Sequence, residues 1–111
     1  MSEPNSVLAR LMAVIEDRKQ NPPERSYTTK LLRGGVEKIG AKIAEEAAEV
    51  VEAAAEPGDD GKSHLVYEAG DLLYHLLVML AYRDVRLDEV EAELARRFGM
   101  SGIDEKESRE Q

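Results

Sequence analysis

The chain has 111 residues, and its 23 acidic residues outnumber its 15 basic ones to give a formal net charge of −8. This length fits one domain with a modest core, and a content of 42% hydrophobic and 34% charged residues argues against general disorder. The negative charge argues against a nucleic-acid partner, because such binding comes mostly from Lys and Arg contacts to phosphates. The absence of Cys excludes disulfides and thiolate metal ligands.

The N-terminal segment does not have the pattern of a signal peptide, because no charged region followed by an apolar one is found there. No apolar run approaches the roughly 20 residues that are needed to span a bilayer. We therefore expect a cytoplasmic protein without a membrane segment.

A first helix is predicted over about residues 7–19, where apolar residues recur at helical spacing behind Ser6, a suitable N-cap. The sequence NPPERS should end this helix. Ser26 or Thr28 could then cap a short helical segment that reaches Leu32.

A long amphipathic helix is predicted over about residues 36–55, because apolar residues recur there in steps of three and four. Gly34 and Gly35 should separate it from the short segment before it. The sequence EPGDDGKS should end it, and Asp60 or Ser63 within that sequence would cap the next helix.

A fourth helix is predicted from His64 to about Arg83, and a last one over residues 87–98. The fourth helix is apolar around most of its circumference, so it should be central and buried by a second copy of the chain as well as by its own. We assign residues 1–98 to one domain and residues 99–111 to a polar, disordered tail.

No segment shows the period-two alternation that is typical of β-strands. The fold class is therefore predicted to be all-α, a helical bundle of four to five helices that forms an oligomer. Short connections should make neighbouring helices antiparallel.

Acidic residues form two short motifs on successive predicted helices, Glu45-Glu46-x-x-Glu49 and Glu68-x-x-Asp71. At about 100° per residue, Glu46 and Glu49 fall together on one flank of the apolar stripe of their helix. Glu45 lies further from the apolar stripe around the helix axis, on the side that faces solvent. The first motif therefore contains two acids that can face a neighbouring helix and one that cannot.

One strip, roughly 60° wide, holds four polar residues of the next helix, namely His64, Glu68, Asp71 and His75. In an antiparallel hairpin this strip can face Glu46 and Glu49, so that four carboxylates converge. In the absence of a cation, the carboxylates of such a cluster repel one another. Hard oxygen ligands suit Mg²⁺, with Mn²⁺ as an alternative, and such an ion would neutralise the phosphates of a nucleoside triphosphate during its hydrolysis.

Two other interpretations of these residues are open. The acids could be the solvated faces of two ordinary helices, as most E-x-x-E pairs are. The histidines could belong to a zinc or di-iron site, but di-iron bundles use Glu-x-x-His, and neither His64 nor His75 lies three residues after a Glu. Lys42 is expected to pair with Glu46 at i to i+4, or to reach a phosphate.

The spacing of the acids resembles the E-E-x-x-E…E-x-x-D pattern of the all-α MazG-like nucleoside triphosphate pyrophosphohydrolases. Within that superfamily, four segments resemble the phosphoribosyl-ATP pyrophosphohydrolase family: SYTTKLL at 26–32, KIGAKIAEEAAEVVEAA at 38–54, EAGDLLYHLLVML at 68–80 and LDEVEAELARR at 87–97. The resemblance covers about residues 7–98. Ala44 stands where the family often has Gly, and alanine is small enough to permit the same packing.

The resemblance implies hydrolysis of the α–β phosphoanhydride of phosphoribosyl-ATP to phosphoribosyl-AMP and pyrophosphate, the second step of histidine biosynthesis. It implies that Mg²⁺ is held by four ligands, namely Glu46, Glu49, Glu68 and Asp71. Catalytic roles are implied for Glu45, Glu46 and Glu49, with Glu45 as an auxiliary group. A homodimer or homotetramer is also implied.

Five residues are candidates for binding the nucleotide substrate, namely Lys30, Arg33, Lys38, Lys42 and His75. The SYT segment should help to close over the nucleotide. Two alternative functions use the same fold. One is house-cleaning hydrolysis of non-standard nucleoside triphosphates, and the other is a non-catalytic helical dimerisation module whose acids are a solvated face.

Overall fold

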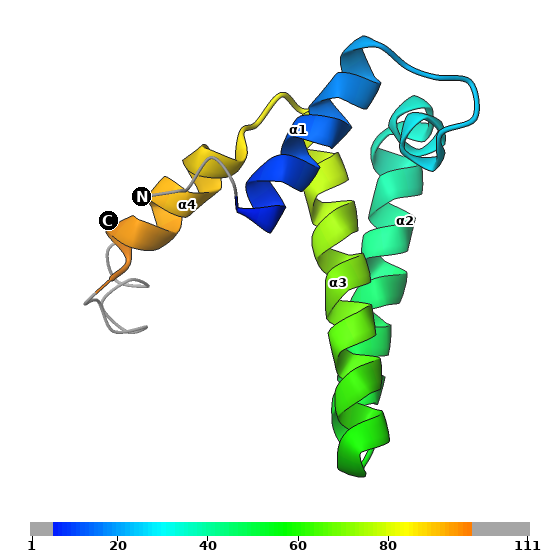
Figure 1. Cartoon of the computed structure of the whole chain (residues 1–111), viewed down its shortest axis with the longest axis vertical. Helices are drawn as coiled ribbons and strands as arrows, with labels where there is room; N and C mark the ends of the chain where they lie inside the picture. Colours follow the sequence, from blue (N-terminus) through cyan, green and yellow to red (C-terminus); the bar gives the residue numbers. More distant parts are fainter. Residues whose placement is uncertain (1–5, 99–111) are drawn as a thin grey trace.

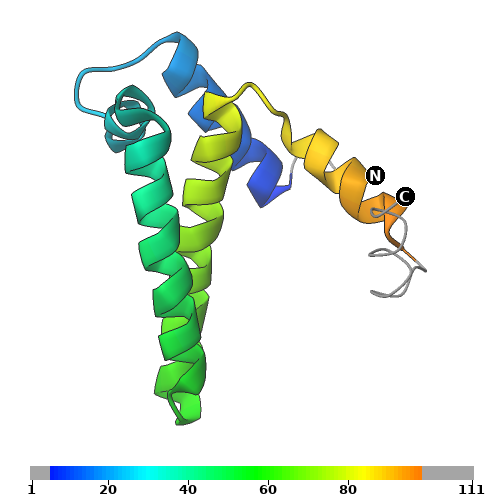
Figure 2. The same ribbon diagram turned by 180° about the vertical axis from the view of Figure 1, so that it is seen from behind.

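The computed structural model describes residues 6–98, which form four helices and no strand. The helices are α1 (Val7–Gln20), α2 (Tyr27–Ala55), α3 (Gly58–Tyr82) and α4 (Leu87–Arg96). α2 and α3 form a long antiparallel hairpin, and α1 packs against both helices at the end far from the α2–α3 turn (Figure 1, Figure 2). The all-α prediction is confirmed. The predicted tail, residues 99–111, lies outside the described residues.

The hydrophobic core lies where α1 meets the hairpin. Its buried side chains come from three helices: Met12, Ile15, Leu31, Ile39, Leu77, Val78 and Ala81. Complete burial of a side chain such as Ile15 contributes about 2 kcal/mol. Because the core occupies one end, the other half of the hairpin depends on the contact between α2 and α3 alone.

The ends of α1 are held by polar groups. The Ser6 hydroxyl accepts a hydrogen bond from the backbone N–H of Ala9 at 3.1 Å, which confirms Ser6 as the N-cap. At the other end, Lys19 Nζ donates to the carbonyls of Ala81 and Tyr82 at 2.9 and 3.1 Å. These carbonyls belong to the last turn of α3 and lack partners within that helix. Lys19 therefore joins α1 to the end of α3.

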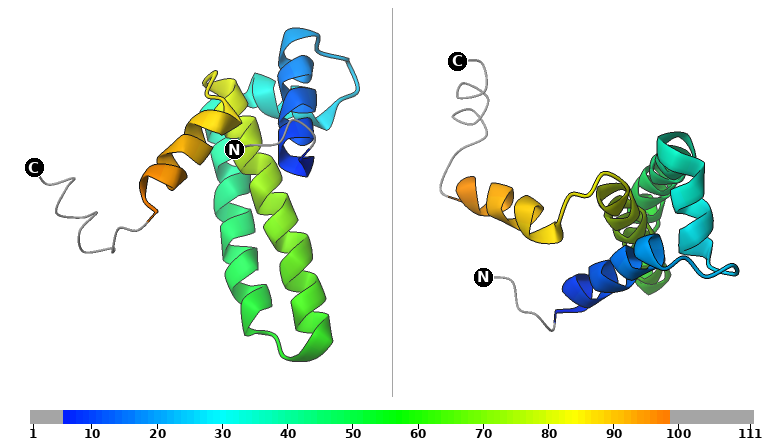
Figure 3. Two further views of the ribbon diagram at one scale, coloured as in Figure 1. Left: turned by 60° about the vertical axis from the view of Figure 1, so that its left-hand side comes forward. Right: turned by 90° about the horizontal axis from the view of Figure 1, so that it is seen from above.

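A break at Gly35 divides α2 into two parts. Gly35 has φ 71° and ψ −163°, a backbone conformation that only glycine adopts readily. Seen from above, residues 27–34 appear lengthwise, whereas the rest of α2 is seen end-on (Figure 3). The predicted interruption at the glycine pair is confirmed. We call residues 27–34 the N-terminal arm of α2; its cap is Ser26, whose hydroxyl accepts from the Thr29 N–H at 3.2 Å.

The predicted start of α3 is wrong. The helix begins at Gly58 with Pro57 as N-cap, so that Asp60 and Ser63 lie inside the helix instead of capping a start at His64. One physical reason is electrostatic, because acidic side chains in a first turn interact favourably with the helix dipole. The connection between α2 and α3 is correspondingly short.

Close backbone contact makes this short connection possible. A Cβ atom at Gly61 would lie 2.2 Å from the carbonyl oxygen of Glu56, so a larger residue would push the end of α2 away from the start of α3. Glycine at this position therefore allows the two helices to meet at a tight turn.

The predicted antiparallel packing of the last helix is also wrong. α4 begins at Leu87, as predicted, but it points away from the hairpin instead of returning along α3 (Figure 3). None of its residues is buried, and Leu94 and Phe98 are 51% and 81% exposed. The contacts that would hold α4 against α3 are therefore few.

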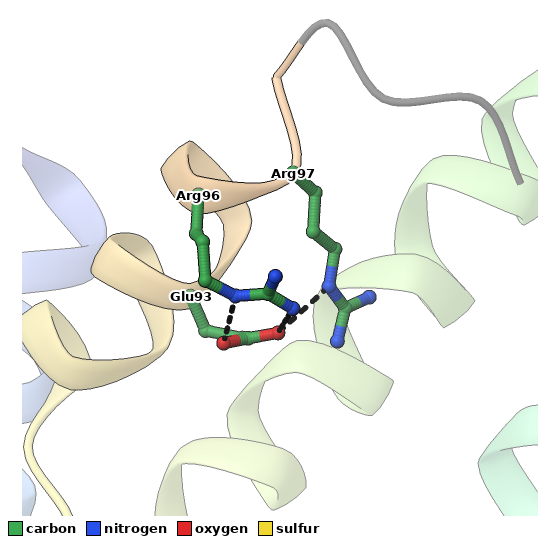
Figure 4. Close-up of polar contacts among 3 residues, drawn as sticks. All are labelled: Glu93, Arg96 and Arg97. Carbon is green, nitrogen blue, oxygen red and sulfur yellow. Dashed lines mark hydrogen bonds and ion pairs between the residues drawn. The ribbon is translucent and has the colours of Figure 1, made fainter. Parts of the chain in front are cut away.

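The C-terminal end of α4 is held by hydrogen bonds among its own charged side chains (Figure 4). Glu93 accepts two hydrogen bonds from Arg96, at 3.1 and 2.8 Å, and one from Arg97 at 2.9 Å. These guanidinium groups lower the pKa of Glu93 to about 2.

By length and composition, α3 would be able to cross a membrane, a criterion that the core helices of soluble proteins also meet. The helix packs against α1 and α2 and buries Glu68 and His75 between them.

The Gly35 conformation leads to a stability prediction. Gly35→Ala should lower the free energy of unfolding by about 1–3 kcal/mol, because alanine is strained at this φ and ψ. Gly40→Ala is the matched control, since its Cβ would meet only the Met79 methyl group at 3.9 Å. It should leave stability unchanged or raise it by up to about 1 kcal/mol. Chemical denaturation of both variants checks this; equal midpoints would contradict it.

Candidate metal centre

Three carboxylates from α2 and α3 meet between the two helices. Glu46, Glu68 and Asp71 each offer an oxygen, and these three atoms lie within 4.8 Å of one another. Glu46 and Glu68 are only 6% and 4% exposed, and Asp71 is half-buried. The predicted convergence of acids across the groove is therefore confirmed for these three. The solvated-face interpretation is wrong for Glu46 and Glu68, because both are buried.

Glu49 is the fourth acid of this cluster. It is half-buried one turn after Glu46, and it interacts with both Glu46 and Glu68. A hydrogen bond with Glu49, followed by burial, raises the pKa of Glu68 to about 7. Burial, followed by the charges of Asp71 and Glu49, raises the pKa of Glu46. Both pKa values are raised because burial and neighbouring negative charges disfavour the ionised form of a carboxyl group.

A divalent cation fits this group of acids. Glu46 Oε2 is buried without a hydrogen-bond partner, which is costly for a carboxylate oxygen. A cation beside it would satisfy that oxygen and neutralise the repulsion among its neighbours. All the donors are carboxylate oxygens, the ligand type that Mg²⁺ and Mn²⁺ prefer.

His64 extends the cluster toward the α2–α3 turn. Its Nδ1 lies 2.9 Å from a Glu56 oxygen, and its Nε2 lies 3.6 Å from Glu68 Oε2. The hydrogen bond with Glu56 raises the pKa of His64. The imidazole thus places partial positive charge beside Glu68, without joining the three carboxylates that approach one another most closely.

Glu45 and Lys42 form an ion pair at the edge of the cluster. Lys42 Nζ donates to Glu45 Oε2 at 3.0 Å, and both side chains are partly exposed. The expected pairing of Lys42 with Glu46 does not form, because Glu46 is turned into the groove. The prediction that Glu45 points away from the groove is confirmed by its exposure.

The other basic candidates lie elsewhere on the surface. Lys30 and Lys38 are exposed, and Arg33 lines a pocket together with Arg18 and Tyr82. That pocket lies between α1 and the N-terminal arm. Lys42 is therefore the basic candidate that the fold places beside the carboxylates.

The N-terminal arm of α2 contacts α3 just beyond Asp71. The Tyr27 hydroxyl lies 3.0 Å from His75 Nε2, and His75 Nδ1 lies 2.8 Å from the backbone carbonyl of Asp71. The hydroxyls of Thr28 and Tyr74 are hydrogen-bonded to each other. Sequence reasoning placed the SYT segment near the nucleotide but missed these pairings, because 48 positions separate Tyr27 from His75 and no local signal links them.

Comparisons with known proteins point to one family. The profile of the phosphoribosyl-ATP pyrophosphohydrolase family matches residues 8–98. A phosphoribosyl-ATP pyrophosphatase of Rhodopirellula baltica is 58% identical over 92% of this chain and 85% of its own length. Those of Dinoroseobacter shibae and Rhodobacter capsulatus are 58% and 54% identical, each over 94% of this chain and over 99% and 98% of their own lengths.

The shifted pKa of Glu68 predicts a pH-dependent stability in the absence of metal. The pKa of Glu68 rises from 4.5 to about 7 on folding. The contribution of protonated Glu68 to the free energy of unfolding is therefore fully present below pH 4.5 and is lost as the pH rises through 7. In buffers containing a chelator, the denaturation midpoint should therefore fall between about pH 5 and pH 8. Glu68→Gln should flatten this dependence.

Glu93→Gln provides the control for this pH series. The pKa of Glu93 is lowered from 4.5 to about 2, so its contribution is present above pH 4.5 and is lost toward pH 2. This variant should keep the wild-type slope between about pH 5 and pH 8. An unchanged slope in Glu68→Gln would show that the buried carboxylates do not titrate as described.

Proposed function

The chain belongs to the phosphoribosyl-ATP pyrophosphohydrolase family, and from this premise we propose that it hydrolyses phosphoribosyl-ATP to phosphoribosyl-AMP and pyrophosphate. This reaction breaks the α–β phosphoanhydride bond in the second step of histidine biosynthesis. The observation that carries the proposal is the near full-length similarity to relatives named for this activity. The buried carboxylate cluster supports it, because phosphoanhydride hydrolysis needs charge neutralisation that an acidic protein does not otherwise supply.

We propose that Mg²⁺, or alternatively Mn²⁺, is held by four carboxylates, namely Glu46, Glu49, Glu68 and Asp71. When bound, the ion supplies neutralisation of phosphate charge and a lowered pKa for coordinated water. Glu46 contributes an oxygen that has no other partner, and Glu68 has the His64 imidazole 3.6 Å from one of its oxygens. The surrounding protein therefore orients the carboxylates before any ligand arrives.

Glu45 and Lys42 are well placed to exchange partners when substrate binds. Their ion pair is partly exposed, and such pairs contribute only about 0–1 kcal/mol. We propose that Lys42 moves to a substrate phosphate and thereby frees Glu45 to accept a proton from the attacking water. Glu46 and Glu49 keep catalytic roles through the metal they hold. Lys30, Arg33 and Lys38 stay candidates for contacts to the rest of the nucleotide, whereas His75 is buried and both of its ring nitrogens are hydrogen-bonded within the protein.

A homodimer or homotetramer is the proposed assembly, in the cytoplasm. Val66, Leu73 and Leu76 are 74%, 45% and 40% exposed on α3. Their spacing, at i, i+7 and i+10, puts them on one side of the helix, which α2 leaves uncovered. A second copy of the chain would remove this apolar stripe from water.

Activity is tested by pyrophosphate release from phosphoribosyl-ATP with and without Mg²⁺. Glu46→Gln should lower kcat more than about 100-fold, because loss of a residue that only supports a ligand already costs about 10–100-fold. Without metal, the same variant should be at least as stable as the wild type, since one repelling charge is removed.

Glu52→Gln is the matched control, because Glu52 is an exposed acid on the same helix. It should retain full activity. Faster turnover of deoxynucleoside triphosphates than of phosphoribosyl-ATP would instead favour the house-cleaning alternative. Full activity of Glu46→Gln would leave the carboxylate cluster without a catalytic role.

The oligomer is tested by light scattering after size-exclusion chromatography. Leu73→Glu should shift the wild-type dimer or tetramer toward the monomer, because it places a charge in the apolar stripe of α3. Val14→Glu on α1 is the control, since Val14 has a similar exposure, 47% against 45%. A monomeric wild type, or equal behaviour of the two variants, would contradict this assembly.

A further inference from the structure

A chain of two hydrogen bonds links the N-terminal arm of α2 to the backbone of Asp71. The first joins the Tyr27 hydroxyl to His75 Nε2 at 3.0 Å, and the second joins His75 Nδ1 to the Asp71 carbonyl at 2.8 Å. His75 is 4% exposed, so water does not compete for either ring nitrogen. Both hydrogen-bonding positions of this imidazole are therefore used within the protein.

The chemistry of the groups sets the direction of both bonds. A backbone carbonyl only accepts, so Nδ1 of His75 must carry a hydrogen and donate it to Asp71. In the neutral imidazole the other nitrogen, Nε2, then has a lone pair, and the Tyr27 O–H donates to it. The Tyr27 hydroxyl thus selects the His75 tautomer that holds the Asp71 carbonyl.

The position of the arm depends on such contacts. Because Gly35 interrupts α2, no continuous helix holds Tyr27 at a fixed distance from Glu46. Two consecutive arm residues instead bind two consecutive residues of α3, since Thr28 bonds to Tyr74 beside the Tyr27–His75 pair. The Tyr27 ring also stacks on Tyr74, with centroids 6.2 Å apart and an angle of 20° between the planes.

The arm contact lies at the edge of the carboxylate cluster. Burial raises the pKa of the Tyr27 phenol, and the charges of Lys42 and Glu46 also act on it, as expected for a phenol close to both. The hydrogen bond to His75 anchors the Tyr27 hydroxyl, whereas the side chain as a whole is 47% exposed. Tyr27 therefore lies between the interior contact to His75 and the open side of the cluster.

We propose that Tyr27 and His75 are positioning residues for Asp71, and that their two hydrogen bonds, rather than docking of the arm as a whole, support cation binding by the carboxylates. Their hydrogen bonds hold the α3 turn that begins at Asp71, and this turn directs the Asp71 side chain toward Glu46 and Glu68. Because the cation site belongs to the proposed function, this inference rests on it. Groups that orient a metal ligand in this way commonly change metal affinity about 10–100-fold when removed.

The test measures Mn²⁺ binding to the metal-free full-length protein by isothermal titration calorimetry, without substrate. Tyr27→Phe keeps the ring and its stacking on Tyr74 but removes the hydroxyl donor. It should weaken Mn²⁺ binding about 10-fold. Thr28→Val is the matched control, because it removes the neighbouring hydrogen bond between the arm and Tyr74, which does not lead to Asp71. This control should bind Mn²⁺ within about twofold of the wild type.

Thermal unfolding of the metal-free variants separates positioning from mere stability. Tyr27→Phe and Thr28→Val should lower the melting temperature by similar amounts, while only Tyr27→Phe loses Mn²⁺ affinity. Equal Mn²⁺ affinity in Tyr27→Phe and the wild type would overturn the inference, as would an equal loss in both variants. Absence of Mn²⁺ binding by the wild type would instead overturn the proposed metal site itself.

Discussion

Repulsion among carboxylates buried between α2 and α3 is the constraint on which the rest of this structure depends. Glu46, Glu68 and Asp71 approach one another within 4.8 Å in a groove with little access to water. In such surroundings, like charges stay ionised only if a cation is near, and otherwise some of them take up protons. The raised pKa of Glu46 and Glu68 is the consequence, and the free energy needed to hold the acids together comes from packing elsewhere in the chain.

That packing is concentrated at one end of the hairpin. α1, the N-terminal arm and the second half of α3 share the buried core, and Lys19 ties α1 to the final carbonyls of α3. The acids lie along the hairpin beyond this core, where only α2 and α3 face each other. Separation of the two regions lets the core provide stability while the groove keeps an electrostatically unfavourable cluster ready for a cation.

Periodicity explains why much of the site was predictable. The residues Glu46, Glu68 and Asp71 all lie on flanks of apolar stripes, and a helical turn of about 100° per residue fixes their faces before any contact is known. The same reasoning places Glu45 in solvent, as its exposure confirms. The start of α3 was predicted too late, because Asp60 and Ser63 resemble N-caps although a close approach of Gly61 to Glu56 allows an earlier start.

The sequence by itself determined the helical composition of the protein, the family and the faces on which the acids lie, because these depend on local periodicity and residue type. Only the tertiary structure decided that Tyr27 meets His75, that Lys42 pairs with Glu45 and that α4 leaves the hairpin. The first and last of these depend on the direction of the chain after a break, at Gly35 and in the loop after α3, and a small change in backbone angles there moves the following residues by many ångströms. Lys42 pairs with Glu45 because packing against α3 turns Glu46 into the groove.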